Sequence, residues 1–532
     1  MSRSHHFPSR ALIAAIAVCA LSLGLFATAA SAQAPQGGAL PKNFLWGTAI
    51  AGFQSEMGRG RDIDRTSDWW SWVHDSANIS SKLTSGDLPE NGPGFWSRYS
   101  SDVKLARKGL GANLFRLGFE WSRLFPNAPQ GLPAGASDTS PEMLRALDAQ
   151  ADPAAVARYR QILKSVRANR MSPLVTLNHF TLPGWIHDPL AVREALRGRG
   201  ANADLPPLEK AGWLDDQTVP QFGRYAAWAA WRFGDLVDRW APINEPMVVA
   251  TNGYVNIPGA LAGNFPPGVY SFTAATKAIR NLEAANTVAY EAVKKMDPKS
   301  KVGLVQNMVA FTPGDPASSA DIKATAHADY LFNRLFVNGA VHGDIDGNAD
   351  GVLQPGEKSL HGRRADFVGV NYYFRGRIKA LGFSFTPKIP ILDFLPRTTY
   401  RWKLAPTARE CPTLCSDFGS EIYPAGFRQV LRTAGSWKLP VIVTESGIAD
   451  ARDRLRPAFL RDHLRQMRAA IKAKDANVTG WIGWSLTDNF EWVAGYEPKF
   501  GLYSFNSATL KRTPRSASVK LLRRAMTTNR VP

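Results

Sequence analysis

Short apolar or β-branched runs alternate with amphipathic stretches along most of this chain of 532 residues, and the alternation limits the folds open to it. The runs cover residues 43–53, 114–121, 172–180, 239–245, 301–311, 365–374, 440–446 and 478–488. Amphipathic helical patterns lie between several of them, at 154–170, 219–237 and 457–474. Continuous apolar strands that alternate with helices are typical of a parallel sheet covered by helices. The sequence therefore predicts an α/β fold.

Eight such runs match the number of strands in a closed (β/α)8 barrel, the TIM barrel. An open doubly wound sheet is the alternative, but the pattern G-x-G-x-x-G does not follow the first run. No low-complexity or Ser/Gly-rich linker divides the chain after residue 40. We therefore predict a single-domain TIM barrel with inserted loops over residues 41–526.

The first 32 residues have the pattern of a secretory signal peptide. Arg3 and Arg10 precede an apolar run over residues 11–30, and small residues follow at positions 30–32. A basic start, an apolar centre and a small-residue end mark such a signal. A membrane anchor is the alternative, since the run is nearly long enough to span a bilayer. The loose segment 33–40, which we expect to be flexible, favours cleavage. The prediction is export to the periplasm or the medium, without a stable membrane anchor.

The formal net charge of +19 raises the question of an anionic partner. The basic residues are scattered and form neither a dense run nor a nucleic-acid-binding motif. The sequence therefore predicts a basic outer surface and no nucleic-acid partner, and it leaves the oligomeric state open. Cys411 and Cys415 remain once the signal is removed, and their spacing in an exported chain predicts a small disulfide loop.

Catalytic side chains of TIM barrels lie at the carboxyl ends of the strands. The ends of the predicted strands carry polar and aromatic residues: Gln54, Glu56, Arg116, Glu120, His179, Asn244, Glu245, Asn371, Tyr373, Glu445, Trp484 and Asp488. Some of them have a structural explanation, because Glu120 can pair with Arg123 and Asp488 can cap the following turn. The others predict a polar ring around the mouth of the barrel.

Two acids in this ring, Glu245 and Glu445, end the fourth and seventh predicted strands, so both carboxylates should converge on one mouth. Glycosidic bond cleavage needs such a pair, with one member acting as nucleophile or base and the other as proton donor. A second negative charge nearby raises the pKa of one member. Two unrelated strand-end acids are the alternative, which spacing alone does not exclude.

Four motifs make the pattern more specific: FLWGTAIAGFQSE (44–56), NEP (244–246), TESG (444–447) and WSLTDNFEWVAGYEPKFGL (484–502). Together they resemble the signatures of family 1 glycoside hydrolases, the retaining β-glucosidases and β-galactosidases. The resemblance extends from Pro41 to Ala525. The chain is most similar to the archaeal-type β-glycosidases of that family. This similarity rests on the segments GFQSEMG, SDWWSWVHD, SGDLPENGPGFW and EWSRLFPN.

The resemblance implies a role for each matching residue. Glu445 is implied as the nucleophile and Glu245 as the general acid/base, with Asn244 bound to the sugar 2-hydroxyl. Arg116 and Tyr373 are implied to orient the nucleophile, and Asn371 to make a supporting polar contact. The implied sugar-binding residues are Gln54, His179, Glu491, Trp484 and Trp492.

Two positions depart from the usual family pattern. Phe180 replaces a tryptophan with its indole donor, and Ser446 replaces an asparagine, for which we expect little effect.

The sequence thus predicts a retaining β-glycosidase for unphosphorylated β-D-glucosides, working without a cofactor and with its two carboxyl groups about 5–5.5 Å apart. Glu491 argues against 6-phosphoglycosides, because its charge would repel a phosphate. A transglycosylase on the same scaffold and a non-catalytic sugar-binding protein are the alternatives; retention of both carboxylates disfavours the second. The preferred glycone (glucose, galactose or fucose) and the aglycone stay open.

Residues 346–357, DGNADGVLQPGE, fit the calcium-loop pattern D-x-[DN]-x-[DN]-G-x5-E. The predicted ligands are Asp346, Asn348, Asp350, the Val352 carbonyl and Glu357. Pro355 and Gly356 interrupt the helix that normally follows such a loop, so a solvated acidic turn is the alternative. The sequence predicts a structural Ca²⁺ at this loop, far along the chain from either candidate catalytic acid.

Overall fold

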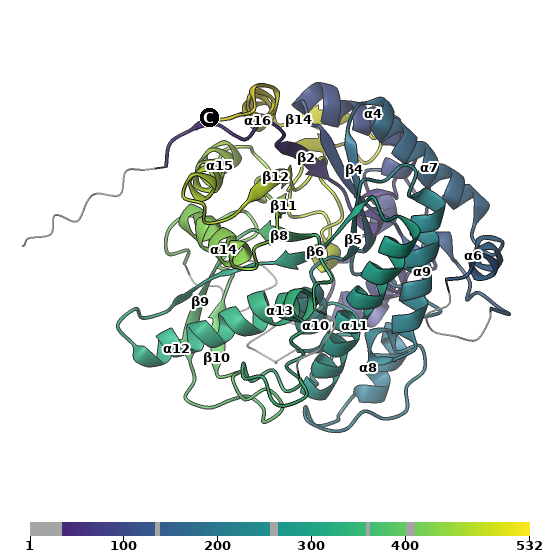
Figure 1. Ribbon diagram of the computed structural model, residues 1–532, viewed down its shortest axis with the longest axis vertical. Helices are drawn as coiled ribbons and strands as arrows, with labels where there is room; N and C mark the ends of the chain where they lie inside the picture. The colour runs from purple at the N-terminus through teal and green to yellow at the C-terminus, as the bar shows by residue number, and fades with distance from the viewer. Residues whose placement is uncertain (1–34, 133–138, 256–263, 358–361, 401–409) are drawn as a thin grey trace, which may run out of the picture. The chain divides into compact units, whose positions relative to one another are not determined.

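Parallel strands at the centre of the structure close into a barrel, and helices surround it (Figure 1). The structure is a computed structural model that describes residues 35–132, 139–255, 264–357, 362–400 and 410–532. Within these residues the barrel has eight strands in the order β11-β12-β2-β3-β4-β5-β6-β8. Each neighbouring pair is parallel. The predicted (β/α)8 TIM barrel is confirmed.

Each predicted apolar run contains one barrel strand. The strands are β2 (Leu45–Ala49), β3 (Leu114–Gly118), β4 (Ser172–Asn178), β5 (Arg239–Ile243), β6 (Lys301–Asn307), β8 (Phe367–Tyr372), β11 (Val441–Ser446) and β12 (Val478–Gly483). Nearly every residue of these strands is buried, because the barrel interior covers one face and the helices cover the other.

The long helices between the strands form the outer layer (Figure 1), and short ones such as α1 lie in the loops at the strand ends; the α-helices of the described residues are listed next. They are α1 (Gly52–Ser55), α2 (Asp68–His74), α3 (Ser76–Ser80), α4 (Phe95–Lys104), α5 (Trp121–Leu124), α6 (Pro141–Asp148), α7 (Pro153–Ala168), α8 (Pro189–Leu196), α9 (Thr218–Phe233), α10 (Pro246–Tyr254), α11 (Phe272–Met296), α12 (Ser319–Ala328), α13 (Leu335–His342), α14 (Pro424–Ser436), α15 (Arg456–Lys472) and α16 (Ser516–Thr528). The three predicted amphipathic stretches correspond to α7, α9 and α15. The start of α7 shows why: Asp152 accepts a hydrogen bond from the Ala155 amide, and Pro153 occupies the first helical position.

A small apolar cluster fills the barrel interior. Its members come from facing strands and include Leu114, Leu174, Ala241, Val305, Phe367, Ile442 and Ile482. Glycines make room for the larger rings, since a side chain at Gly303 would collide with the Phe367 ring. The interior is therefore a packed core and not a channel.

The ends of the described chain meet at one short antiparallel ladder. β1 (Gly38–Ala39) pairs with β15 (Arg530–Val531), and the Leu40 amide donates to the Asn529 carbonyl. Residues 36–532 consequently belong to one compact unit, which extends beyond the predicted limits 41–526 on both sides. The predicted signal peptide, residues 1–32, lies outside the described residues. In the part of the chain that is described, no helix combines the length and apolarity of a membrane span.

A second, smaller sheet stands beside the barrel. It contains β7 (Ala310–Pro313), β9 (Arg375–Ala380) and β10 (Phe394–Arg397), and a further hairpin joins β13 (Tyr503–Phe505) to β14 (Arg512–Pro514). Cys411 and Cys415 form a disulfide, as predicted. In the loop that this disulfide closes, the Thr413 hydroxyl donates to Glu421, which pairs with Arg375 and Arg377 of β9.

Candidate active site

Glu245 stands where β5 ends and α10 begins. The residue precedes the helix as its N-cap and has the left-handed backbone conformation, φ 49°, while Pro246 takes the first helical position. Its amide donates to the Val305 carbonyl of the adjoining strand, which ties this turn to the barrel. The turn directs the carboxylate into the mouth, where the side chain is buried.

Glu445 belongs to β11 and is held by two donors. The Arg116 guanidinium, from β3, donates to Oε1, and the Tyr373 hydroxyl donates to Oε2. The acid and the arginine are both almost completely buried, so water does not weaken their attraction. The predicted role of Arg116 and Tyr373 in orienting this carboxylate agrees with these contacts.

Asn371 connects the two acids. It lies in register with Glu445 on the neighbouring strand β8, and its side-chain amide donates to Oε1 of Glu245 at 2.6 Å. Asn307, at the end of β6, donates to the same oxygen at 3.1 Å. The two carboxylates, two hundred positions apart in sequence, therefore share one buried polar network.

The surroundings of the two acids favour different protonation states. Burial, and next the negative charge of Glu445, raise the pKa of Glu245 to about 8. Burial also raises the pKa of Glu445, but Arg116 and then the Tyr373 hydroxyl oppose this rise. Because a cation and a phenol stabilise its charged form, Glu445 is the member of the pair that ionises first. The site thus favours a charged Glu445 beside a protonated Glu245.

Asn244 and His179 lie beside this pair. The Arg116 guanidinium donates to Asn244 Oδ1 at 2.7 Å, which leaves the Asn244 amide group turned towards His179 Nε2 at 3.4 Å. Burial and the nearby guanidinium lower the pKa of His179 well below its usual value, so the imidazole is neutral. Both side chains can exchange hydrogen bonds with a neutral polar ligand.

Two buried oxygens at the mouth have no hydrogen-bond partner among the described residues: Gln54 Oε1 and Glu491 Oε2. The amide nitrogen of Gln54 is held by Asn489 Oδ1 at 3.1 Å and by the Phe490 carbonyl at 3.0 Å. Burial, and next the charges of Glu445 and Glu245, raise the pKa of Glu491 to about 8. Buried unpaired oxygens are costly unless a ligand or water satisfies them, so both point to a hydroxylated ligand.

Aromatic rings form one wall of the mouth. The His179 ring lies nearly parallel to Trp484, with ring centres 5.8 Å apart, and to Trp492, with ring centres 6.0 Å apart. Phe180 and Phe265 contact Trp492 edge-on or tilted. Flat apolar faces next to polar groups are typical of sugar-binding pockets. Ten of the eleven predicted catalytic and sugar-binding residues are thus found at the carboxyl ends of the barrel strands or in the loops after them, and Arg116 reaches Glu445 from the middle of β3.

Two structural pairings differ from those weighed from the sequence. Arg123 pairs with Glu56 at 2.6 Å, and Glu120 instead accepts hydrogen bonds from the Phe53 amide and the Thr181 hydroxyl. Asp488 does accept a backbone hydrogen bond, from Gly501, but its second function is a buried ion pair with Arg515. The sequence order of neighbouring charges did not indicate which of them would meet.

Asn307 is a site residue that the sequence analysis missed. It ends the apolar run of the fifth strand, so the strand-end rule that selected the other residues applies to it as well. That run continues past Asn307 with Met308 and Val309, which hides the strand end in the sequence.

The acids predicted as calcium ligands make hydrogen bonds within their own loop and to Tyr330. Asp346 accepts hydrogen bonds from the Tyr330 hydroxyl and the Gly351 amide, and Glu357 accepts from the Gly347 amide at 2.9 Å. Asn348 donates to Asp350. Within the described ranges, no three His, Cys, Asp or Glu side chains are placed so that they could hold a metal ion together. Ca²⁺ binding at 346–357 therefore stays a prediction from the sequence.

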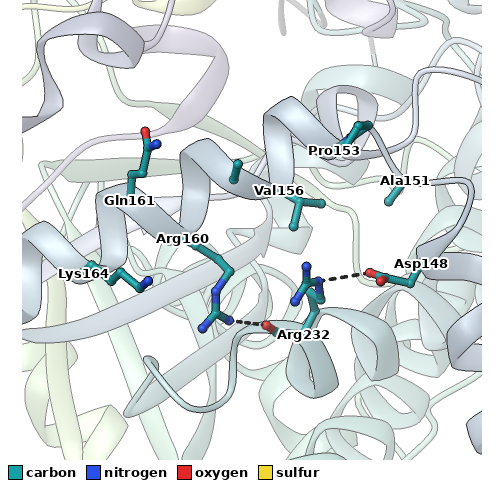
Figure 2. A pocket seen from close by; sticks show the side chains of 9 residues that line it. Asp148, Ala151, Pro153, Val156, Arg160, Gln161, Lys164 and Arg232 are labelled. Atoms are coloured by element: carbon teal, nitrogen blue, oxygen red, sulfur yellow. Dashed lines mark hydrogen bonds and ion pairs between the residues drawn. The ribbon is translucent and has the colours of Figure 1, made fainter.

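A hollow of about 400 Å³ lies on the outer helices, away from the candidate site (Figure 2). Its lining comes mainly from α7, which contributes Arg160 and Lys164, and α9 adds Arg232. Figure 2 shows that Arg232 pairs with Asp148 and that Arg160 donates to the Arg232 carbonyl. None of the predicted site residues lines this hollow.

The sequence profile of Glycosyl hydrolase family 1 matches residues 36–191 and 204–531. The β-galactosidase of Pyrococcus woesei is 38% identical over 516 residues, which are 92% of this chain and 98% of that protein.

Solved structures agree with this similarity. The β-glycosidase from the hyperthermophile Thermosphaera aggregans superposes with a TM-score of 0.80 at 34% identity, covering 93% of this chain and 98% of that one. The hyperthermophilic β-glucosidase from Pyrococcus furiosus superposes with a TM-score of 0.77, also at 34% identity, covering 93% and 97%. The match therefore includes the whole barrel and its mouth.

Proposed function

The chain belongs to glycosyl hydrolase family 1 and is an O-glycosyl hydrolase, and from this premise we propose that it is a retaining β-glycosidase acting on unphosphorylated β-D-glucosides. One observation carries the proposal: Glu445 is buried between a guanidinium and a phenol, while burial and then the charge of Glu445 raise the pKa of Glu245 to about 8. A carboxylate nucleophile and a carboxylic acid donor are the two groups that double displacement requires.

In the first step, Glu445 attacks the anomeric carbon and forms a covalent bond, while Glu245 donates its proton to the leaving oxygen. Formation of the glycosyl-enzyme removes the negative charge of Glu445. Since that charge helps to raise the pKa of Glu245, the pKa of Glu245 falls at this point. The acid of the first step is thereby prepared to act as a base.

In the second step, the ionised Glu245 takes a proton from water, and the oxygen of that water attacks the anomeric carbon and releases Glu445. Two inversions give a product with retained β configuration. Asn244, held by Arg116 at 2.7 Å, is suited to bind the 2-hydroxyl, where a contact that strengthens in the transition state lowers the barrier. The proposal includes a separation of about 5–5.5 Å between the carboxyl groups.

The choice of substrate rests on Gln54 and Glu491, whose unpaired buried oxygens are acceptors for sugar hydroxyls. A phosphate at the 6-position would bring further negative charge near Glu491 and the two catalytic acids, so unphosphorylated sugars are favoured. The relatives include a β-galactosidase and a β-glucosidase, which supports β-galactosides as additional substrates beside β-glucosides.

The test compares the native enzyme with Glu445→Gln on a panel of nitrophenyl β-glycosides. We expect the variant to lose about 10⁴-fold or more in kcat, because no other group can form the covalent intermediate. Asp102→Asn is the matched control: it also changes a buried carboxylate to an amide, but Asp102 pairs with Arg512 outside the barrel mouth. NMR of the first sugar released, taken before mutarotation, should show the β anomer. An α anomer would contradict the retaining mechanism.

We also propose that the enzyme works outside the cytoplasm, on the basis of the signal-like pattern over residues 1–32. Amino-terminal sequencing of the protein purified from culture medium or periplasm tests this. A mature amino terminus near residue 33 is expected, and a protein retained in the cytoplasm with its first 32 residues intact would contradict export.

A further inference from the structure

Gln54 and His179 come from different parts of the barrel mouth. Gln54 lies in α1, just after β2, and His179 follows β4. The strand between them is β3. For both side chains to meet one sugar, the two loops have to be held at a constant spacing across the end of β3.

Glu120 occupies that place. It comes two residues after the end of β3, and its side chain is buried, with 1% of the residue exposed. Oε1 accepts a hydrogen bond from the Phe53 amide at 2.8 Å, and Oε2 accepts one from the Thr181 hydroxyl at 2.7 Å. Phe53 adjoins Gln54 in the chain, and Thr181 is two residues after His179. One carboxyl group therefore bridges both loops.

The packing around Glu120 leaves little freedom. A Cβ atom on Gly52 would lie 2.6 Å from Glu120 Cγ, so the absence of a side chain at position 52 allows this approach. The Glu120 amide donates to the Tyr159 hydroxyl at 2.9 Å, which in turn donates to Glu56. The backbone and the side chain of Glu120 are thus both held in place.

Electrostatics around Glu120 differ from those of a buried ion pair. Among the described residues its carboxyl group contacts no cation, because Arg123 is engaged by Glu56 at 2.6 Å. Burial, and next the charge of Glu56, raise the pKa of Glu120 to about 8. A neutral side chain of the same shape can therefore replace it: the oxygen of a glutamine can accept from Phe53, and its nitrogen can donate to the Thr181 hydroxyl.

We propose that Glu120 is a positioning residue, which sets the spacing between Gln54 and His179 and so the fit of the sugar, without touching the substrate itself. The inference rests on the proposed glycosidase function. Loss of the bridge would let the two loops move apart, which weakens sugar binding more than the chemistry at Glu245 and Glu445. The expected signature is a rise in KM that exceeds any fall in kcat.

The experiment measures kcat and KM for nitrophenyl β-glucoside with Glu120→Ala, Glu120→Gln and the control Asp102→Ala. Asp102 is a second buried carboxylate, paired with Arg512 in the outer layer. For Glu120→Ala we expect KM to rise about tenfold or more, since small misplacements of binding groups have effects of this size. Glu120→Gln should recover most of the native KM, and Asp102→Ala should leave KM unchanged even where it lowers the melting temperature. A native KM in Glu120→Ala, or no recovery in Glu120→Gln, would overturn the proposal.

A second pair of variants covers the case in which Glu120→Ala does not fold. Thr181→Val removes a single hydroxyl from the bridge, and it should raise KM in the same direction by a smaller factor. In a double-mutant cycle, the effects of Thr181→Val and Gln54→Ala on KM should be non-additive in free energy, because both substitutions weaken the same sugar contacts. Strict additivity would contradict the bridge. An inactive native enzyme would instead refute the proposed function, so the two failures can be told apart.

Discussion

Asn371 donates its side-chain amide to Oε1 of Glu245 at 2.6 Å. This single contact opposes the effect of burial, because a hydrogen bond to the charged form of an acid lowers its pKa. Asn371 also hydrogen-bonds to Glu445 and lowers its pKa, and its own oxygen accepts from the Thr444 hydroxyl at 2.7 Å. The strength of the proton donor in this site therefore depends on an amide from a third strand.

Replacing Asn371 with alanine should move the alkaline limb of activity to higher pH. The donor form of Glu245 is lost as the pH rises through its pKa of about 8, and removal of the amide raises that pKa further. The measurement is kcat/KM against pH, since this ratio reports the free enzyme. An alkaline limb that stays in place or moves to lower pH would contradict the assignment of Glu245 as the acid.

Glu245→Gln should slow the enzyme by an amount that depends on the leaving group. Poor leaving groups need the proton from Glu245, so phenyl or alkyl glucosides should lose several orders of magnitude in rate. With dinitrophenyl glucoside, the dinitrophenolate group leaves without protonation. Hydrolysis of the glycosyl-enzyme, the second step, should then limit the rate. Added azide needs no base, so it should restore turnover with dinitrophenyl glucoside and give a β-glucosyl azide. Equal losses for all leaving groups and no effect of azide would argue against the acid/base role.

Arg515→Ala should destabilise the fold without acting at the site. Arg515 makes two hydrogen bonds to Asp488, at 2.9 and 2.8 Å, and both side chains are almost fully buried. Removing one partner leaves a buried charge unpaired, which costs about 3–5 kcal/mol in the free energy of unfolding. Arg461→Ala is the matched control, because Arg461 pairs with Asp462 on the surface and its loss should cost less than about 1 kcal/mol. Denaturant unfolding of both variants measures the two losses in the free energy of unfolding. Equal losses would contradict the difference expected between the buried and the surface ion pair.

The calcium prediction can be settled by melting the protein with calcium and with a chelator. An ion that binds only the folded state at 100 times its Kd raises the free energy of unfolding by about 2.7 kcal/mol. If residues 346–357 bind Ca²⁺, the melting temperature should rise with calcium, and Asp346→Asn should abolish the rise. Equal melting temperatures under both conditions would leave this segment as the acidic turn held by Tyr330 and backbone amides.

The sequence by itself determined the barrel and the positions of its two acids. A strand buried on both faces needs a continuous apolar run, so eight such runs mark eight strands, and Glu245 and Glu445 stand out as charges at their ends. The disulfide was also predictable, because Cys411 and Cys415 are only four residues apart. These features are local: each depends on a few neighbouring residues and on the polarity of their surroundings.

Only the tertiary structure decided which polar groups meet. Arg123 bonds to Glu56, 67 positions away, although Glu120 is its near neighbour in sequence. β1 pairs with β15 across almost the whole chain, which places the limits of the ordered unit outside the predicted ones. Asn307 enters the site because β6 ends there, inside an apolar run that continues. A buried charge takes the partner that the packing of strands and loops brings within hydrogen-bond distance, and that geometry depends on every element at once.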